Sequence, residues 1–552
     1  MSTHEVTNQS PPLSEYNVLS ADPALLEGLE RWGNEQDLVG LKALGDLAGS
    51  VEAQTWGDQA DRNLPVLQTH SPQGDRIDEV DYHPAWHLLM STAVSNGLTA
   101  EPWTRPAGSG AHVRRAVGFV AWSQVEAGHM CPVSMSYAAV PALRANTDLA
   151  DIWTPLLASR EYDFGLRPHA AKSGAIAGMG MTEKQGGSDL RSNTTVAVAV
   201  PDGPVAGGQT YQLTGHKWFC SAPMSDMFLI LGQAPAGPTC FVVPRILDDG
   251  TRNTFELQRL KDKLGNRSNA SAEIELDTTW GVQLGEEGRG IRTILDMVAA
   301  TRLDCVLGSS ATMRQALVRG IHHTRHRAAF GSALVDQPLM RNVLMDLALE
   351  SEAATTLGLR LAAAVDEGDT AFSRLAVAVG KYWVCKRTAP MVAEALECLG
   401  GNGIVEENGL ARLYREAPVN SVWEGSGNVV ALDVLRALTR EPESAAAFTA
   451  ELQLAHGADH RLDTAVTNAV AALQNAAGSS GPTAAQSGAR ALVEQLATTL
   501  QACLLTRFAP SYVSEAFIAS RLGGSHGHTF GTLPGDLAAA SAGRVIERAF
   551  PA

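Results

Sequence analysis

The feature of this sequence that most constrains its fold is a change of residue pattern that later reverses. From Ala21 to about Ala171, helix-forming residues dominate, as in "DLVGLKALGDLAGS". From about Thr194 to Leu284 the chain runs instead in short β-branched or alternating segments such as "TTVAVAV", "TYQLTGHKWF", "MFLILGQ", "TCFVVPRI", "TFELQRL" and "AEIELD". Helical periodicity then returns and continues to about Leu438. We therefore expect a small antiparallel β domain between helical regions.

The pattern predicts an α+β multidomain chain that begins with an extended arm at 1–20. "TREPES" breaks the helical pattern before the tail, and "NAAGSSGPTAAQSG" predicts a loop within it. Three or four domains suit 552 residues, since roughly 150 residues per domain is usual. The expected domains are an N-terminal arm and helical domain at 1–175, a middle β domain at 176–284, a helical domain at 285–440 and an additional helical tail domain at 441–552.

Composition narrows the class of protein. The net charge of −16 does not favour nucleic acid or anionic membranes in general. The seven cysteines are scattered, odd in number and without a C-x-x-C pair, which argues against disulfides or a zinc site and favours a reducing cytoplasm. The N-terminus lacks a basic region followed by an apolar run, and no apolar run approaches the roughly 20 residues of a membrane span. We expect a cytoplasmic protein without a membrane segment.

One short stretch, "MTEKQGGSD" at Met181–Asp189, lies where the helical pattern gives way to strands. Its glycines free the backbone to approach another group closely. Thr182 and Ser188 add hydroxyls to the main-chain N–H donors. These groups suit a flat ligand with hydrogen-bonding edges. The alternative is a Gly-rich loop that only leads into a strand.

Six motifs in order resemble the acyl-CoA dehydrogenase family of FAD enzymes, over roughly Ala21–Leu438. The resemblance is greatest to the AidB-type branch, associated with the bacterial alkylation response, and "SRLGGSHGHTFGTLP" extends it into the tail. It implies an N-terminal helical domain, a middle β-barrel, a C-terminal four-helix bundle and the cofactor FAD. The six motifs are "MTEKQGGSD", "GHKWFCS", "RLKDKLGNRSNASAEIELD", "HRAAFG", "ECLGGNG" and "WEGSGN".

The resemblance implies that the first motif lies along the flavin and the pyrophosphate. Main-chain N–H groups of Met181–Ser188, including Gly187, and the Thr182 hydroxyl would bond the pyrimidine edge of the isoalloxazine. Such donors stabilise the negative charge that appears there on reduction. Ser188 would reach a phosphate oxygen.

In "GHKWFCS", the resemblance implies that Phe219 packs on the flavin and that the Ser221 hydroxyl bonds near flavin N5. Two-residue alternation places both side chains on one face of a strand. The alternative is that Trp218 and Phe219 are ordinary core aromatics, and we expect this of Trp218.

In "WEGSGN", the resemblance makes Glu424 the base that removes the α-proton of an acyl-CoA, after which hydride passes from the β-carbon to flavin N5. A carboxylate suits this role in a dry pocket, where desolvation raises its pKa. Gly425 would let the loop approach the cofactor. The alternative is a surface glutamate at a helix start. The remaining cofactor contacts expected in this motif are Trp423, Ser426 and Asn428.

Some members of the family carry the base on the first long helix after the β domain. The corresponding position here is Thr301, which has no carboxylate, so Glu424 keeps the role. The adjacent Arg302 matches a family arginine beside the base, and its charge would lower the pKa of the base. A purely structural ion pair is the alternative.

The other FAD contacts are expected at "RHRAAFG" and "ECLGGNG". Arg327 and Phe330 match family residues that contact FAD of a neighbouring subunit, so an obligate homo-oligomer is expected, in the family's tetrameric dimer-of-dimers form. Gly400 and Gly401 would give a phosphate close access to the backbone. Glu397 stands where the family has Gln, and a carboxylate would repel the pyrophosphate.

His322 and His326 are four residues apart, a spacing that can bind a metal. No third ligand is placed beside them by the sequence, so no metal site is predicted.

The tail leaves DNA binding open but disfavoured. Residues 441–552 hold nine acidic residues against six basic ones, and binding by counterion release needs clustered cations. Three functions stay in competition: an acyl-CoA dehydrogenase that uses an electron-transferring flavoprotein as acceptor, a DNA-protecting flavoprotein with weak dehydrogenase activity, and a flavin enzyme that removes alkylating agents. The six basic residues are Arg461, Arg490, Arg507, Arg521, Arg544 and Arg548.

Overall fold

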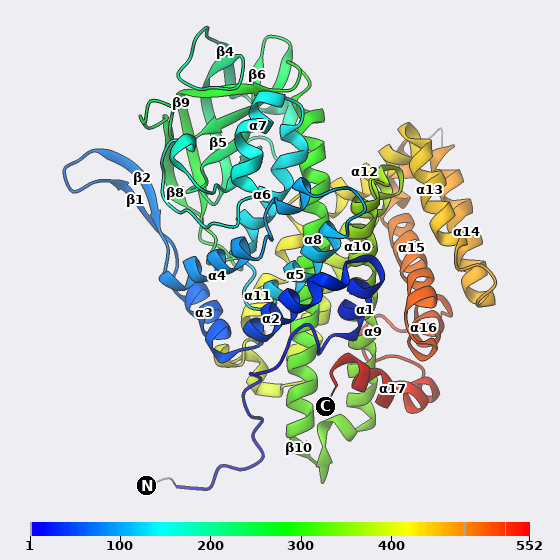
Figure 1. The fold of residues 1–552 in the computed structure, drawn as a ribbon. Helices are drawn as coiled ribbons and strands as arrows, with labels where there is room; N and C mark the ends of the chain where they lie inside the picture. The colour runs from blue at the N-terminus through cyan, green and yellow to red at the C-terminus, as the bar shows by residue number, and fades with distance from the viewer. Residues whose placement is uncertain (1–2, 479–481, 525, 552) are drawn as a thin grey trace. The chain divides into compact units, whose positions relative to one another are not determined.

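The structure is a computed structural model that describes residues 3–478, 482–524 and 526–551. It contains helices and a β-sheet in two compact units, which confirms the α+β class (Figure 1). The first unit comprises Met1–Val51, Ala107–Gln124 and Arg302–Ala552, and the second comprises Glu52–Pro106 and Val125–Thr301. In the described part of the chain, no helix is long and apolar enough to cross a membrane.

A seven-stranded sheet forms the centre of the second unit. Strands β6, β4, β5, β9 and β7 pair in turn, and β7 pairs back to β6, so this part closes into a barrel. β3 extends it beside β6, and β8 pairs with β9. All six segments predicted as strands are confirmed. The strands are β3 (Ala177–Gly180), β4 (Val196–Ala199), β5 (Thr210–Ser221), β6 (Met227–Ala234), β7 (Gly237–Pro244), β8 (Phe255–Leu260) and β9 (Ser271–Leu284).

Four helices and a hairpin complete the second unit. The Ser136 hydroxyl on α6 accepts a hydrogen bond from Ala177 N at the start of β3. The hairpin, β1 (Val66–His70) and β2 (Arg76–Asp81), lies where helix was expected, and that prediction was wrong. "VLQTH" and "RIDEV" alternate in burial and flank a turn at Gly74, where φ is +95°. The helices are α3 (Val51–Arg62), α4 (Pro84–Ser95), α6 (Met130–Leu143) and α7 (Thr147–Leu157).

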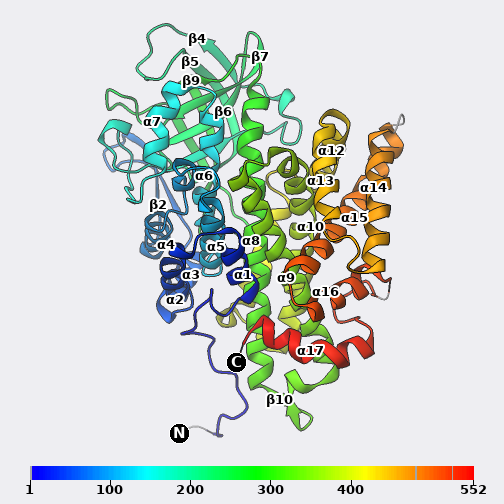
Figure 2. The same ribbon diagram turned by 45° about the vertical axis from the view of Figure 1, so that its right-hand side comes forward.

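Long helices form the first unit, and Figure 2 shows them from a second side. α9 packs against α1, α5 and α10, and α10 packs against α12. The Asp369 carboxylate caps α10 by accepting from Phe372 N, directly after Gly368 ends α9 in a left-handed conformation. The helices are α1 (Pro23–Trp32), α2 (Leu38–Ala48), α5 (Ala111–Ser123), α8 (Gly290–His326, of which the first unit holds the part from Arg302 onward), α9 (Pro338–Glu367), α10 (Thr370–Glu397), α11 (Leu410–Glu416) and α12 (Gly427–Arg440).

The tail adds further helices to the same unit, where α17 packs on α9 and α15 packs on α12. The predicted break is confirmed, since α12 ends at Arg440 and α13 begins at Pro442. The predicted loop at 475–488 was too long because α14 continues to Ala477 and α15 begins at Pro482; residues 479–481 of that loop lie outside the described residues. The tail helices are α13 (Pro442–Gln453), α14 (His460–Ala477), α15 (Pro482–Phe508), α16 (Ser511–Phe517) and α17 (Gly535–Ala549), with a π-helical turn at Ile518–Leu522.

Candidate active site

The "MTEKQGGSD" segment leaves β3 and folds into a tight turn in the second unit. Glu183 N donates to Gly186 O at 2.8 Å, and Gly186 N donates back to Glu183 O at 3.2 Å. Trp218 N on β5 donates to Thr182 O at 2.8 Å. A Cβ at Gly186 would lie 2.4 Å from the Ser192 hydroxyl, so packing requires this glycine. The segment is therefore fixed directly beside "GHKWFCS".

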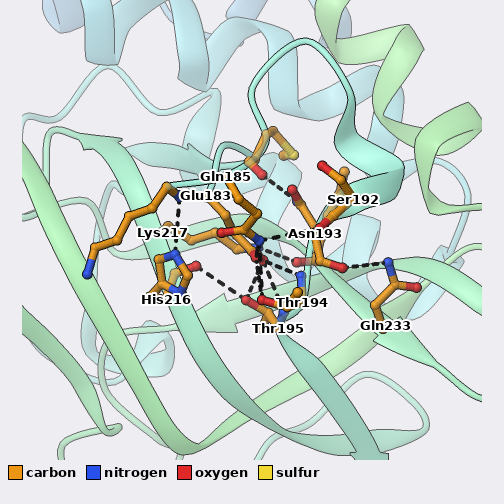
Figure 3. Close-up of polar contacts among 12 residues, drawn as sticks. Glu183, Gln185, Ser192, Asn193, Thr194, Thr195, His216, Lys217 and Gln233 are labelled. Atoms are coloured by element: carbon orange, nitrogen blue, oxygen red, sulfur yellow. Dashed lines mark hydrogen bonds and ion pairs between the residues drawn. The ribbon is translucent and has the colours of Figure 1, made fainter.

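The Glu183 carboxylate is the centre of the hydrogen bonds that hold this segment (Figure 3). It is 1% exposed. Oε1 accepts from Lys217 Nζ at 2.7 Å and from the Thr195 hydroxyl at 2.6 Å. Oε2 accepts from Thr194 N at 2.7 Å and from Gln185 Nε2 at 2.6 Å. One buried carboxylate thus ties both sides of the loop to β5.

The Glu183–Lys217 pair is an ion pair. Burial alone would raise the pKa of Glu183, but the bonds from Lys217, Thr194 and Thr195 outweigh it and lower the pKa to about 2. Burial lowers the pKa of Lys217, and Glu183 opposes that shift. Neither residue was predicted as functional, although both stand inside the motifs that were singled out.

The same segment leaves hydrogen-bond donors unused. In the described part of the chain, the amides of Thr182, Gly187 and Ser188 and the hydroxyls of Thr182 and Ser188 make no hydrogen bond. Thr182 and Met181 are half-buried, and Gly187 and Ser188 are exposed. Unused donors on a rigid, partly covered turn suit a ligand edge rich in carbonyl oxygens, such as the pyrimidine edge of a flavin.

Phe219 and Ser221 leave β5 on its less buried side, because Cys220 between them is fully buried. Phe219 is 50% exposed, and the Ser221 hydroxyl lies 3.1 Å from the Ser271 hydroxyl. The prediction that Trp218 is a core residue was wrong. Its ring is only half-buried and lies under the ammonium of Lys261, which is 3.2 Å from the ring centroid.

In the first unit, Glu424 has a left-handed backbone conformation, with φ at +56°. This conformation is rare for a residue with a side chain and marks a constrained position. Gly425 follows with φ at +99°, and a Cβ on it would lie 3.3 Å from Arg302 Nη2. The Trp423 indole donates to Asn420 Oδ1 at 2.8 Å. The turn before α12 is therefore fixed on both sides of Glu424.

Two buried cations hold this turn. Lys381 Nζ on α10 donates to the carbonyl oxygens of Trp423, at 2.9 Å, and of Gly425. Arg302 Nε on α8 donates to Glu424 O at 3.0 Å. Three consecutive carbonyl groups thus accept from cationic donors, which make the stronger class of hydrogen bond.

Arg302 also donates from Nη1 to Asp433 Oδ2 at 2.6 Å. Burial alone would raise the pKa of Asp433, but Arg302 and Arg374 outweigh it, and the pKa lies below its usual value. The charge of Arg302 is therefore balanced by a partner that sequence reasoning missed. Arg302 lies beside the predicted base, as expected, and contacts it through the main chain.

The buried thiol of Cys305 lies close to the same turn. Burial raises its pKa well above the usual value, the Lys381 charge opposes this rise, and the Glu424 carboxylate adds to it. A buried thiol with a raised pKa is unreactive. Cys305 is therefore assigned a packing role on α8.

Arg327 and Phe330 lie at a small hairpin after α8, formed by β10 (Ala328–Ala329) and β11 (Ser332–Ala333). Phe330 stands at its tip with φ at +52° and is fully exposed. Arg327 Nη1 donates to Asn8 O at 2.5 Å, and Ala328 N donates to Asn8 Oδ1 at 2.7 Å. The N-terminal arm therefore binds this hairpin, and the aromatic tip is presented to solvent.

Gly400 and Gly401 lie on the surface after α10. Gly400 has φ at +59°, and a Cβ on either glycine would meet no atom within 4 Å. Open backbone of this kind gives a phosphate room to approach. Glu397 is exposed, and the structure gives it no contact with either glycine.

The two histidines with metal-binding spacing are used in main-chain contacts. His322 Nε2 lies 2.8 Å from Pro11 O, and His326 Nδ1 lies 2.8 Å from His322 O. Among the residues that the structure describes, no group of three or more His, Cys, Asp or Glu could hold a metal.

Comparison with known proteins identifies the chain at the level of its family. The AidB N-terminal domain matches residues 8–164, the acyl-CoA dehydrogenase middle domain matches 178–279, and the acyl-CoA dehydrogenase C-terminal domain matches 288–439. The acyl-CoA dehydrogenase-type protein AidB of Escherichia coli is 48% identical over 80% of this chain and 81% of its own. The chain belongs to the acyl-CoA dehydrogenase family.

Solved structures agree on the fold. Caenorhabditis elegans ACDH-11 in complex with C11-CoA aligns over 98% of this chain and 97% of its own, with 24% identity and a TM-score of 0.83. An acyl-CoA dehydrogenase from Bacillus anthracis complexed with FAD aligns over 97% of this chain and 92% of its own, with 15% identity and a TM-score of 0.69. The protein is an FAD-dependent oxidoreductase of this family.

Proposed function

We propose that this protein is an AidB-type acyl-CoA dehydrogenase in which Glu424 removes the α-proton of an acyl thioester. One observation carries this proposal: Glu424 is held in a left-handed conformation by buried cations bonded to its own carbonyl and to both neighbouring carbonyls. A glutamate that served only as a surface residue would need no such support.

In this mechanism the chain supplies the base and its orientation. Glu424 accepts the α-proton, and the constrained turn that carries it keeps its carboxylate directed at the substrate. Thr182, Ser188, Phe219 and the open glycines are the proposed contacts of the cofactor. The chemistry that bound FAD would supply is acceptance of the hydride that leaves the substrate β-carbon. An electron-transferring flavoprotein is the proposed acceptor, and the seven cysteines, which are all buried and form no disulfide in the described part of the chain, support a reducing cytoplasm as the compartment.

The test is an anaerobic titration of the FAD-loaded protein with short, branched and long acyl-CoAs, following the oxidised flavin band. Rapid bleaching by one class establishes a dehydrogenase and names its substrate class. No bleaching by any class, in protein that retains FAD, would contradict the proposal. Alkylated small molecules would then be the next substrates to test.

The competing proposal, DNA protection through the tail, is opposed by the pairing of the tail arginines. Arg507 pairs with Glu451 at 2.6 Å, and Arg461 pairs with Asp459 at 2.6 Å. The other pairs are Arg521 with Asp346 and Glu350, and Arg548 with Glu27 and Glu352. Four of the six tail arginines are therefore already neutralised by carboxylates. Counterion release on DNA needs cations that are free to meet phosphates.

We accordingly expect weak DNA binding. For a 30-base-pair duplex in about 150 mM salt, the dissociation constant should be no tighter than about 10⁻⁴ M, the weak end of sequence-independent binding. Fluorescence anisotropy over a range of salt concentrations measures both the affinity and its salt dependence. Submicromolar binding that falls steeply with salt would contradict this expectation and support the DNA-protecting alternative.

We also propose a tetramer in which Phe330 reaches a neighbouring subunit. Replacing this exposed residue in Phe330→Asp should dissociate the assembly and weaken FAD binding. The free energy of association should fall by about 2–4 kcal/mol, as for the loss of an aromatic anchor at an interface. Light scattering and FAD retention are the measurements. Leu454→Asp, at an exposed apolar residue of the tail, is the matched control. An unchanged assembly in Phe330→Asp would exclude this contact.

A further inference from the structure

Lys381 is a buried cation that the sequence analysis did not single out. It is 1% exposed, and both groups that it bonds are main-chain carbonyls, those of Trp423 and Gly425. Among the described residues, no carboxylate lies within ion-pair distance of it. Burying an ammonium group costs free energy of folding unless hydrogen bonds compensate for the lost hydration. Its bonds bracket Glu424, one residue on either side.

Asp433 is a second buried charge that acts on the same turn. It is 4% exposed and accepts from Arg302 Nη1 at 2.6 Å, while Arg302 Nε donates to Glu424 O at 3.0 Å. Arg374 on α10 also donates to Asp433, at 3.1 Å, and binds Glu441 at 3.0 Å. The carboxylate of Asp433 therefore fixes the guanidinium that bonds the carbonyl of Glu424.

We propose that Lys381 and Asp433 are positioning residues for the base, Lys381 directly through the carbonyls of Trp423 and Gly425, and Asp433 through Arg302. The inference rests on the proposed function of Glu424. It assigns the two residues no contact with substrate or cofactor.

The physical argument is the conformation that the two residues maintain. A glutamate with φ at +56° reverts to ordinary backbone angles unless its surroundings hold it. Donors arrive from α10 and from α8, two long helices with many buried residues. Arg374 and Lys381 are seven residues apart on α10, so both lie on the face that meets the turn and α12. The donors that hold the turn therefore come from two long helices outside the turn itself.

The first variant is Lys381→Met, which keeps the length of the side chain and removes the charge. Lys381→Arg is the conservative variant, and Lys42→Met, at an exposed lysine of the same unit, is the matched control. Amide hydrogen exchange of residues 419–430 measures the turn without any substrate. We expect exchange in Lys381→Met to be faster by about tenfold or more, as for a segment that opens locally.

The second readout is the rate of flavin bleaching by the acyl-CoA that reduces the wild-type protein. The maximal rate should fall by about 100-fold, as for a misplaced catalytic group, while the concentration that gives half the maximal rate changes little. Lys381→Arg should recover most of both readouts. If Lys381 served only the stability of the fold, Lys381→Met would instead lower the stability and the FAD content of the protein. The maximal rate per bound FAD would then stay unchanged.

The outcomes separate the two proposals. If no acyl-CoA reduces the flavin of the wild-type protein, the proposed function is wrong. The exchange data still decide whether Lys381 holds the turn. Exchange and rate both unchanged in Lys381→Met would overturn the positioning role. If Lys381→Met does not fold, Asp433→Asn, which keeps shape and removes charge, decides on the same two readouts, with faster exchange and slower bleaching expected and unchanged values contradicting the role.

Discussion

Glu424→Gln is expected to abolish the reduction of the flavin by acyl-CoA while leaving FAD bound. The amide keeps the shape of the side chain but cannot accept the α-proton, so the rate of bleaching should fall by about 10⁴-fold, the upper range for loss of a general base. Rapid mixing under anaerobic conditions measures the rate, and the absorbance of the isolated protein measures retained FAD.

The matched control for this experiment is Glu443→Gln, at an exposed carboxylate at the start of α13. It should bleach at the wild-type rate. A Glu424→Gln protein that bleaches within tenfold of the wild-type rate would show that another group takes the proton. The left-handed conformation at residue 424 would then need a different explanation.

The second large effect concerns the ion pair beneath the proposed flavin-binding loop. Lys217→Met leaves the Glu183 carboxylate buried without its cation, and Glu183→Gln leaves the Lys217 ammonium buried without its anion. Breaking a buried pair on one side costs about 3–5 kcal/mol. Hydrogen exchange of the β5 amides should report this loss, and FAD should be released more readily in both variants.

A double variant, Glu183→Gln with Lys217→Met, makes the interpretation sharper. Because it removes both charges, it should be less destabilised than the sum of the two single variants, and the difference measures the coupling of the pair. Glu256→Gln together with Lys42→Met, at two residues outside this network, is the control. Simple additivity in the Glu183 and Lys217 variants would show that the pair contributes no coupling.

The pH dependence has a defined direction. The pKa of Glu183 is lowered in the folded protein to about 2, so its stabilising effect is fully present above the pKa of an unfolded glutamate, about 4.3. That effect is lost as the pH falls from about 4.3 towards about 2. Glu183→Gln should lack this part of the acid dependence, which a comparison of β5 exchange at several acidic pH values can measure.

The sequence by itself determined the class of fold and the cofactor. Short β-branched or alternating segments identified six of the seven strands of the middle β domain, since alternation follows directly from strand geometry, whereas the four-residue β3 was missed. The motifs also carried the resemblance to FAD enzymes, and the family match agrees with it. The β1–β2 hairpin was missed, because strands of five and six residues amid helix formers carry a weak signal.

Only the tertiary structure decided how the two key segments are held. Glu183 meets Lys217 across 34 residues, and Arg302 meets Glu424 across 122 residues and Asp433 across 131. Such partners leave no local pattern, because what joins them is the packing of β5 against the loop and of α8, α10 and α12 against one another. Spacing along the chain can place a side chain on a face of its own element, whereas the partner of a buried charge depends on which elements meet.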